Sequence, residues 1–391
     1  MLSLESSSSI GSESVSSSTA CTSEARTAAG HEAGRGSVEG PWSRTYHAAV
    51  PAHASPQPPH LVTRPRALLA RRPDPLGVLV STAPLVEGAR HVAIDHERVD
   101  RVAAELARAE RRAPAWHRDE LFFDGTARSV TYVLLVDAVN FCFWGEPRWK
   151  YRFRGRWLDG YWALAAALTR AVAATPALLE ADFLAELEPR FFARVFRGQG
   201  EIPLFEQRWR NARELGRALR DRWSGRGTAL VEEARGSAPA LARLVAESLP
   251  SFDDVALHDG REVRFLKRAQ ILVADLWGAF GGKRWGAFGD LEHLTAFADY
   301  KLPQVLRAWG ILRYAPALAA RVGRKVLLPP GSLEELEIRA ATVWAVEWLR
   351  EALHREGVVV SSTEVDWLLW DAGQRALPDM KPYHRTRTIY Y

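Results

Sequence analysis

One apolar segment sets the strongest constraint on the fold. The run from Ser129 to Trp144 is hydrophobic on nearly every helical face, and Asp137 and Asn140 interrupt it. A helix that is apolar all round must be buried among other elements, and this run is too short and too polar to span a bilayer. We therefore predict a central buried helix, inside which Asp137 and Asn140 each need a partner.

Helical patterns continue along most of the chain. The other regions predicted to be helical are 99–111, 160–175, 176–188, 204–223, 237–247, 267–280, 303–314 and 332–356, with a last helix that begins at 361–363. Alternating aromatic and basic residues over 149–157, and a turn at 258–261, predict one or two short β-hairpins. The predicted fold is mainly α, with one large helical domain over residues 76–391.

The first 75 residues differ from the rest of the chain. They are rich in Ser, Gly, Pro and Ala and have no sustained apolar period, so residues 1–75 are predicted to form a disordered tail. The start lacks the basic residues and apolar run of a signal peptide, and Glu5, Glu13 and Glu24 argue against a transit peptide. We expect a soluble, cytoplasmic protein.

Charge and cysteine content limit the classes of partner. The chain of 391 residues has 52 basic and 47 acidic residues, a net charge of +5. This excess suits phosphorylated ligands but is too mild to predict stable nucleic-acid binding. Cys21 and Cys142 form neither a disulfide framework nor a zinc spacing. The motifs of dinucleotide, NTPase, zincin and serine-hydrolase sites are also missing from the sequence.

The stretch from Leu294 to Pro303 carries the main candidate for catalysis. Proline is well suited to the first position of a helix, so we expect Pro303 to open one. Asp299 then lies just before a helix N-terminus, where it could be a plain cap. Alternatively, Phe297, Asp299 and Lys301 alternate along a short extended segment. They would then give one pocket wall an aromatic ring, a carboxylate and a cation.

Two helices offer further candidates. In the last one, Asp366 lies one turn from Trp370 and Trp367 one turn from Asp371. Thr363 and Asp366 could also form a capping box, as could Ser332 and Glu335 in the preceding helix. Lys267 and Arg268 fall in a first helical turn, where the dipole disfavours cations, so we expect an acidic partner or an anion nearby. The aromatic and basic residues 381–391 predict a tail that is docked on the fold.

These segments together resemble the queuosine-salvage family, the queuosine 5′-phosphate N-glycosylases. The resemblance covers residues 91–391, and the N-terminal tail lies outside it. Its strength lies in the order and spacing of several short segments. They are Asn140 to Trp144, Lys267 to Asp275, Phe297 to Leu306, Glu337 to Arg339, Leu369 to Asp371 and Ile389 to Tyr391.

The resemblance implies a single helical domain similar to the helical DNA glycosylases. It implies hydrolysis of queuosine 5′-monophosphate to queuine and ribose 5-phosphate, without a metal or organic cofactor. The family's active carboxylate matches Asp299. Its base-binding positions match His91, Phe297, Asp366, Trp367 and Asp371, although family members often have Tyr where Trp367 stands. For the 5′-phosphate we nominate Lys301, Lys267, Arg268 and Arg385.

The chemistry suits these residue types. A carboxylate stabilises or traps the oxocarbenium charge that builds up at the anomeric carbon, and aromatic rings stack on the leaving base. Two alternatives remain open at this point. One is a DNA or RNA glycosylase that acts on a flipped base; the other is a non-catalytic protein that binds queuine or tRNA. We expect a monomer whose partner is a small nucleotide.

Overall fold

The computed structural model describes residues 65–109, 116–375 and 380–391, all of which fall in one compact unit. Helices dominate these residues, and the strands among them form two-stranded antiparallel sheets. The mainly α prediction is therefore confirmed. The predicted disorder of residues 1–64 lies outside the described residues, and the likeness to helical DNA glycosylases stays a prediction.

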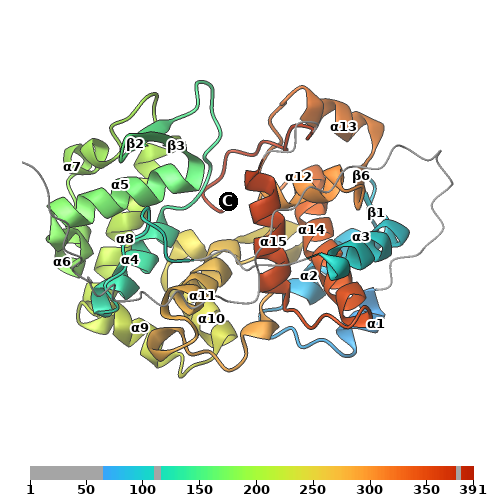
Figure 1. Cartoon of the computed structure of the whole chain (residues 1–391), viewed down its shortest axis with the longest axis horizontal. Coiled ribbons are helices and arrows are strands. Elements are labelled where there is room, and N and C mark those ends of the chain that lie inside the picture. The colour runs from blue at the N-terminus through green and yellow to red at the C-terminus, as the bar shows by residue number, and fades with distance from the viewer. Residues whose placement is uncertain (1–64, 110–115, 376–379) are drawn as a thin grey trace, which may run out of the picture. The chain divides into compact units, whose positions relative to one another are not determined.

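The elements follow one another in the order shown in Figure 1. The helices are α1 (Pro65–Leu69), α2 (Val78–Glu87), α3 (His96–Arg108), α4 (Ala127–Ala138), α5 (Gly160–Ala174), α6 (Ala181–Ala185), α7 (Pro189–Val195), α8 (Phe205–Trp223), α9 (Gly227–Glu233), α10 (Ala238–Ser248), α11 (Lys267–Phe280), α12 (Lys301–Ala308), α13 (Pro316–Gly323), α14 (Leu333–Arg355) and α15 (Ser362–Gln374). The strands are β1 (Val92–Ile94), β2 (Lys150–Phe153), β3 (Arg156–Asp159), β4 (Val255–His258), β5 (Arg261–Arg264) and β6 (Leu312–Tyr314). Short 3-10 turns lie at Pro176–Leu179, Pro250–Phe252, Arg284–Gly286 and Leu291–His293.

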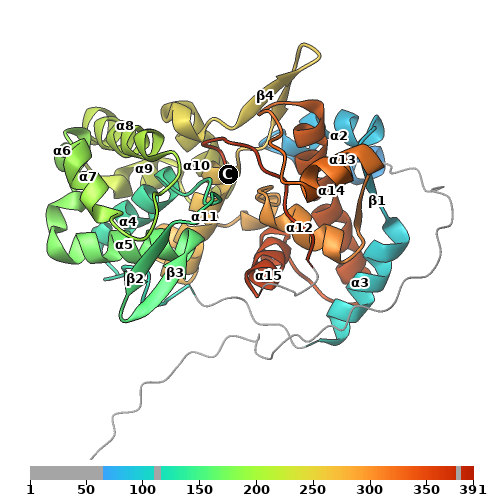
Figure 2. The same ribbon diagram turned by 90° about the horizontal axis from the view of Figure 1, so that it is seen from above.

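The helices gather in two groups with α10 and α11 between them (Figures 1 and 2). Helices α4 to α9 form one group, in which α8 packs on α4, α6 and α9. In the other group α14 packs against α2, α3, α12 and α15. Helix α11 contacts α4 as well as α10, so it joins the first group to the middle of the protein.

Residues 65–75, which were expected to belong to the tail, take part in the fold. Helix α1 buries Leu68, and Nε of Arg72 lies 2.9 Å from Oε2 of Glu347 on α14. The same guanidinium donates to the carbonyl of Leu294 at 2.9 Å. The structure therefore differs from the predicted tail of residues 1–75 at residues 65–75, because the buried ion pair ties them to α14 and α1 packs on α2.

The predicted central helix is buried but ends at Ala138, six residues before the predicted end at Trp144. Buried side chains take the carbonyls that a longer helix would use. Asn211 Nδ2 donates to Ala138 O at 3.0 Å, and the guanidinium of Arg208 donates to Val139, Phe141 and Cys142. Cys142 also has φ +45°, which cannot continue a helix. Tertiary hydrogen bonds therefore replace the last helical turns.

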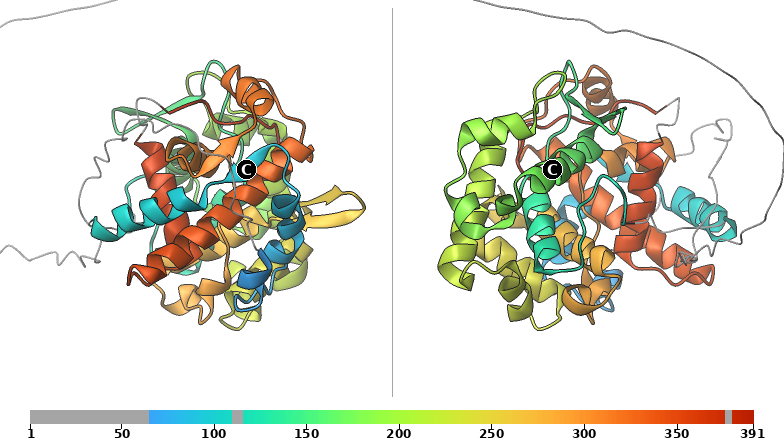
Figure 3. Two further views of the ribbon diagram at one scale, coloured as in Figure 1. Left: turned by 90° about the vertical axis from the view of Figure 1, so that its right-hand side faces the viewer. Right: turned by 60° about the vertical axis from the view of Figure 1, so that its left-hand side comes forward.

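Both predicted hairpins are confirmed. Strand β2 pairs with β3 and β4 with β5, each in antiparallel register. The β4–β5 hairpin projects from the helices (Figures 2 and 3), with its base packed on α2. A further pair, β1 with β6, joins segments that are far apart in the sequence.

Some predicted helix starts differ from the structure. The region 176–188 forms a 3-10 turn followed by α6, not one helix. Pro303 is the third residue of α12, not the first. Ser332 makes no side-chain cap at α14, and Glu335 instead accepts from Gly331 N at 3.1 Å. These starts depend on partners outside the helices, which local pattern does not reveal.

Candidate active site

A cavity of about 260 Å³ lies where the two groups of helices meet α11. Because its lining comes from segments far apart in the sequence, the tertiary fold creates it. It is lined by Trp116, Leu121, Asn140, Phe141, Phe143, Arg148, Asp159, Gly160, Tyr161, Trp162, Lys267, Ile271, Asp275, Trp277, Gly278, Phe297, Asp299, Tyr300, Lys301, Leu302, Asp366, Trp367, Trp370, Gln374, Tyr383 and Tyr391.

Asp299 lies at the start of α12 and faces this cavity. Its Oδ1 accepts from the backbone N–H groups of Lys301 at 2.7 Å and Leu302 at 2.9 Å. Asp299 thus satisfies two N–H groups that the first helical turn leaves free. The two interpretations of Asp299 are compatible, because one carboxylate oxygen caps the helix and the other accepts no hydrogen bond from the described residues. Phe297 and Lys301 also line the cavity, as the alternation predicted.

Lys267 provides the positive charge beside Asp299. Burial raises the pKa of Asp299, whereas Lys267 and the backbone donors of Leu302 and Lys301 lower it. Burial in turn lowers the pKa of Lys267, and the charges of Asp299 and Asp137 oppose that change. The expectation of an acidic partner near the first turn of α11 is confirmed for Lys267.

Asp366 lines the cavity and does not cap its own helix. Ser361 and Glu364 form the capping box of α15, so the proposed box of Thr363 with Asp366 is wrong. Oδ2 of Asp366 instead accepts from the backbone N–H of Phe297 at 2.7 Å. Burial raises the pKa of Asp366 to about 8, and the charge of Asp299 adds to the shift.

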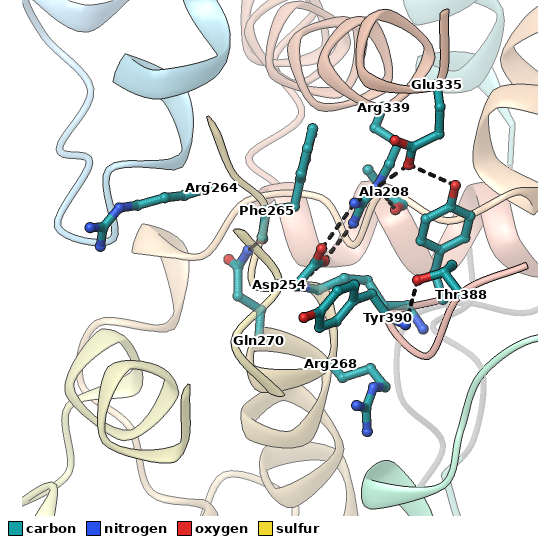
Figure 4. Close-up of polar contacts among 12 residues, drawn as sticks. Asp254, Arg264, Phe265, Arg268, Gln270, Ala298, Glu335, Arg339, Thr388 and Tyr390 are labelled. Carbon is teal, nitrogen blue, oxygen red and sulfur yellow. Dashed lines mark hydrogen bonds and ion pairs between the residues drawn. The ribbon is translucent and has the colours of Figure 1, made fainter. Parts of the chain in front are cut away.

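A buried ion-pair network supports the backbone next to Asp299 (Figure 4). Arg339 on α14 binds Asp254 through both terminal nitrogens, at 2.9 and 2.5 Å. Its Nε donates to the carbonyl of Ala298 at 3.1 Å. Glu335, one turn earlier on α14, accepts from the hydroxyl of Tyr391 at 2.7 Å. The network therefore fixes the peptide that precedes Asp299 and docks the final segment of the chain, as predicted for that segment.

Aromatic rings form much of the cavity wall. Phe297 is buried, and Trp367 lies 5.7 Å from Trp277, centroid to centroid, at an interplanar angle of 32°. Trp370 makes edge contacts with Tyr161 and Trp162. Such rings suit a flat heteroaromatic ligand.

Two cations of the lining lie near Tyr383. Nζ of Lys301 lies 5.6 Å from the ring centroid of Tyr383 and 3.4 Å from the carbonyl of Gly373. Arg148 reaches the same tyrosine, with Nη2 3.5 Å from its hydroxyl oxygen. Nη1 of Arg148 is paired with Asp159 at 3.2 Å. The arrangement can receive an anion between Lys301 and Arg148.

Four of the nominated residues do not line the cavity. The buried guanidinium of Arg268 donates to the carbonyls of Asp137, Ala138 and Ser251, so it supports the end of α4. Arg385 pairs with Glu146 at 2.8 Å. The binding of phosphate by these two residues stays a prediction.

The other two nominated residues outside the lining were expected to bind the base. His91 precedes β1, and its backbone N–H donates to Glu337 Oε2 at 2.6 Å. Asp371 is near the end of α15, beyond Trp367, and pairs with Arg375. The structure does not bring either side chain into the lining, and their roles in base binding stay predictions.

Sequence reasoning missed several residues of the lining. Asp275 and Arg148 line the cavity but were not among the nominated site residues. The spacing of Lys267, Ile271 and Asp275, four residues each, could have placed Asp275 on the cavity face of α11. No sequence pattern could have identified Arg148, because it comes from the loop before β2.

The described residues include no group of His, Cys, Asp and Glu side chains arranged to hold a metal ion. Within the same residues, no helix combines the length and the apolar character needed to cross a bilayer.

The fold and the cavity define a helical protein with a small-molecule site built from buried carboxylates, aromatic rings and lysines. The family model described as queuosine salvage protein matches residues 121–391. The queuosine 5′-phosphate N-glycosylase/hydrolase of Sphaerobacter thermophilus is 52% identical over 318 residues, 81% of this chain and 98% of that protein. This chain belongs to the queuosine salvage protein family.

Relatives with the same name occur in distant organisms. The protein of Mus musculus is 36% identical over 335 residues, which cover 81% of this chain and 99% of that protein. The protein of Dictyostelium discoideum is 34% identical over 335 residues, 81% of this chain and all of that protein. The family resemblance inferred from the sequence is confirmed.

Proposed function

We propose that this protein hydrolyses the N-glycosidic bond of queuosine 5′-phosphate and releases queuine for reuse in tRNA modification. The observation that carries the proposal is Asp299, a buried carboxylate that shares one cavity with aromatic rings and cations. The names of the relatives support the substrate. The partner is a small nucleotide, and the protein acts as a cytoplasmic monomer without stable binding of nucleic acid.

Asp299 is the catalytic residue of the proposed reaction. As the bond to the base breaks, positive charge develops at the anomeric carbon, and a nearby carboxylate stabilises it electrostatically or by forming a glycosyl ester. The two backbone donors on Oδ1 hold the carboxylate in place. Lys267 favours its ionised form. Water completes the hydrolysis, so the products are the free base and ribose 5-phosphate.

Base recognition is assigned to the aromatic and acidic wall. Phe297 and Trp367 contact the faces of the base, where stacking contributes roughly 1–3 kcal/mol. Asp366 binds the polar edge of the base; its high pKa, about 8, lets it carry a proton at neutral pH and offer a donor as well as an acceptor. A site with these buried polar groups discriminates against bases that leave them unpaired.

Lys301 and Arg148 are assigned to the 5′-phosphate. Both line the cavity near Tyr383. Lys301 is two residues from Asp299, so an anion on the sugar can reach it while the anomeric carbon faces Asp299. Lys267 remains a phosphate candidate, although its position beside Asp299 fits a role in catalysis better.

The proposal is tested with purified protein and three compounds: queuosine 5′-monophosphate, queuosine and GMP. Base release is followed by chromatography for the wild type and for Asp299→Asn. We expect queuine to be released from the monophosphate and a loss of at least about 1,000-fold in the variant, as for removal of a key charge-stabilising group. The variant should fold normally, because an Asn Oδ1 can accept the same two backbone N–H groups.

Two outcomes would redirect the proposal. Binding of queuosine 5′-monophosphate without any base release would support the carrier hypothesis. Release of a base from DNA or RNA, but not from the nucleotide, would support the flipped-base glycosylase instead.

A further inference from the structure

The cavity has an acidic end that the reaction described above does not use. One face of α11 lines the cavity through Lys267, Ile271, Asp275 and Gly278. Lys267 and Asp275 are eight residues apart, about 12 Å along a helix. Lys267 lies beside Asp299, so the backbone of Asp275 lies about two helical turns from the residue beside Asp299.

Asp275 differs from the other acidic side chains of the lining. Asp299 and Asp366 each accept from backbone N–H groups, and Asp159 is paired with Arg148. Asp275 is only 9% exposed, and among the described residues the indole of Trp116 is the one hydrogen-bond donor that acts on its carboxyl group. A buried carboxyl group with a single neutral donor is costly to ionise. It is therefore available to a ligand that brings a donor into the cavity.

The surroundings of Asp275 favour a cationic donor. The fully buried Asp137 lies close enough to raise the pKa of Asp275, after the larger effect of burial. Oδ2 of Asp137 also has no hydrogen-bond partner among the described residues. The charge of Lys267 opposes these shifts, and that of Asp366 adds to them. Two adjacent buried carboxyl groups are stabilised in their ionised form when a positive charge enters.

Aromatic rings complete this end of the cavity. Trp116 packs directly against α11 at Gly278, where a Cβ atom would lie 3.0 Å from Cδ1 of the indole. Trp277, on the same helix, stacks near Trp367. Indole rings attract cations through their π faces. A carboxyl group beside tryptophans forms a site for an alkylammonium group.

We propose that Asp275 binds the protonated secondary amine that links the 7-deazaguanine ring of queuine to its cyclopentenediol. The inference rests on the proposed function and identifies the residue that distinguishes queuine from unsubstituted 7-deazaguanine. The ammonium N–H donates to the Asp275 carboxylate. The base lies between this end and Asp299, so the two charged groups of the nucleotide, amine and phosphate, face opposite ends of the cavity.

The test compares the affinities of three free bases for the full-length wild type and for Asp275→Asn. Queuine and 7-aminomethyl-7-deazaguanine are cationic, whereas 7-deazaguanine is neutral. We expect the variant to bind both cationic bases about 10- to 100-fold more weakly, the loss of a charge-assisted hydrogen bond. Its affinity for 7-deazaguanine should stay within about twofold. Asp221→Asn, which removes an exposed carboxylate outside the lining, is the matched control and should leave all three affinities unchanged.

If Asp275→Asn lowers the affinity for cationic and neutral bases equally, or does not lower it at all, the inference is overturned. If Asp275→Asn does not fold, Asp275→Glu replaces it; because the carboxylate moves, the cationic bases alone should bind more weakly. The two proposals fail in different ways. A wild type that binds none of the bases and releases none from the nucleotide refutes the proposed function, whereas a functional wild type with unchanged selectivity in the variant refutes only the role of Asp275.

Discussion

The backbone N–H of Phe297 donates to Oδ2 of Asp366 across 2.7 Å, joining the segment before α12 to the middle of α15. The contact couples two site residues that are 69 positions apart in the chain. It fixes the segment two residues before Asp299, while Arg339 fixes the carbonyl of Ala298. The backbone next to Asp299 is thus held from two sides by helices α15 and α14.

The buried Asp366 should make stability depend on pH. Its pKa is raised from 3.8 in the unfolded chain to about 8, so the native state binds a proton that the unfolded chain has lost. Stability from this group is complete below about pH 4 and is lost as pH rises toward 8, by at most about 1.4 kcal/mol per pH unit. Asp366→Asn should remove this dependence, which urea unfolding at pH 4, 6 and 8 would measure. If the free energies of unfolding of wild type and variant differ by the same amount at all three pH values, Asp366 is not the source of the pH dependence.

Lys267 should set the acidic limb of the pH–rate profile. Replacing it with Met removes the charge that favours the ionised form of Asp299. The limb should move to higher pH by about 1–3 units, the range for loss of a neighbouring opposite charge. The exposed Lys283 lies outside the lining, so Lys283→Met is the control and should leave the profile unchanged. If Lys267 binds phosphate instead, its loss will raise KM for the nucleotide without moving the limb.

Arg339→Met should destabilise the protein strongly. It leaves the carboxylate of Asp254 buried without its partner, and removing one member of a buried pair costs about 3–5 kcal/mol. The surface pair of Arg355 with Asp100 is largely exposed, so Arg355→Met should cost less than about 1 kcal/mol. Denaturant unfolding of the two variants provides the comparison, and similar losses would argue against a special role for the network around Ala298.

Lys301 and Arg148 should determine the preference for nucleotide over nucleoside. Lys301→Met or Arg148→Met should lower kcat/KM for queuosine 5′-monophosphate by about 10- to 100-fold, because each removes a charged hydrogen-bond donor. Activity on queuosine, which lacks the phosphate, should change little. Lys325→Met alters an exposed cation outside the lining and serves as the control. An equal loss of kcat/KM on the nucleotide and on queuosine would show that the two residues do not bind the phosphate.

The start of the ordered unit can be located by truncation. A chain that begins at residue 65 keeps Leu68 and Arg72, whereas one that begins at residue 75 loses both. Loss of Arg72 removes one charged donor from Glu347, which keeps Arg350 and Ser362, so the shorter chain should be less stable by about 1.5–3 kcal/mol. Thermal unfolding of the two chains measures the difference. Equal melting temperatures would show that α1 and Arg72 contribute nothing.

Local sequence pattern predicted much of the fold. Periodicity located α5, α8, α10 and α11 closely, because their apolar faces and helix ends are encoded by neighbouring residues. It failed at the end of α4, where Arg208, Asn211 and Arg268 take the backbone carbonyls. It also failed at α15, where Ser361 forms the cap in place of Thr363.

The sequence by itself determined the helical class, the two hairpins, the family and the segment that contains Asp299, since each depends on residues close together in the chain. Only the tertiary structure decided which charged groups share the cavity. It placed Lys267, Asp275 and Arg148 in the lining and Arg268 outside it. The reason is physical: a buried charge is stable only where distant segments supply its partners, and chain spacing does not encode those contacts.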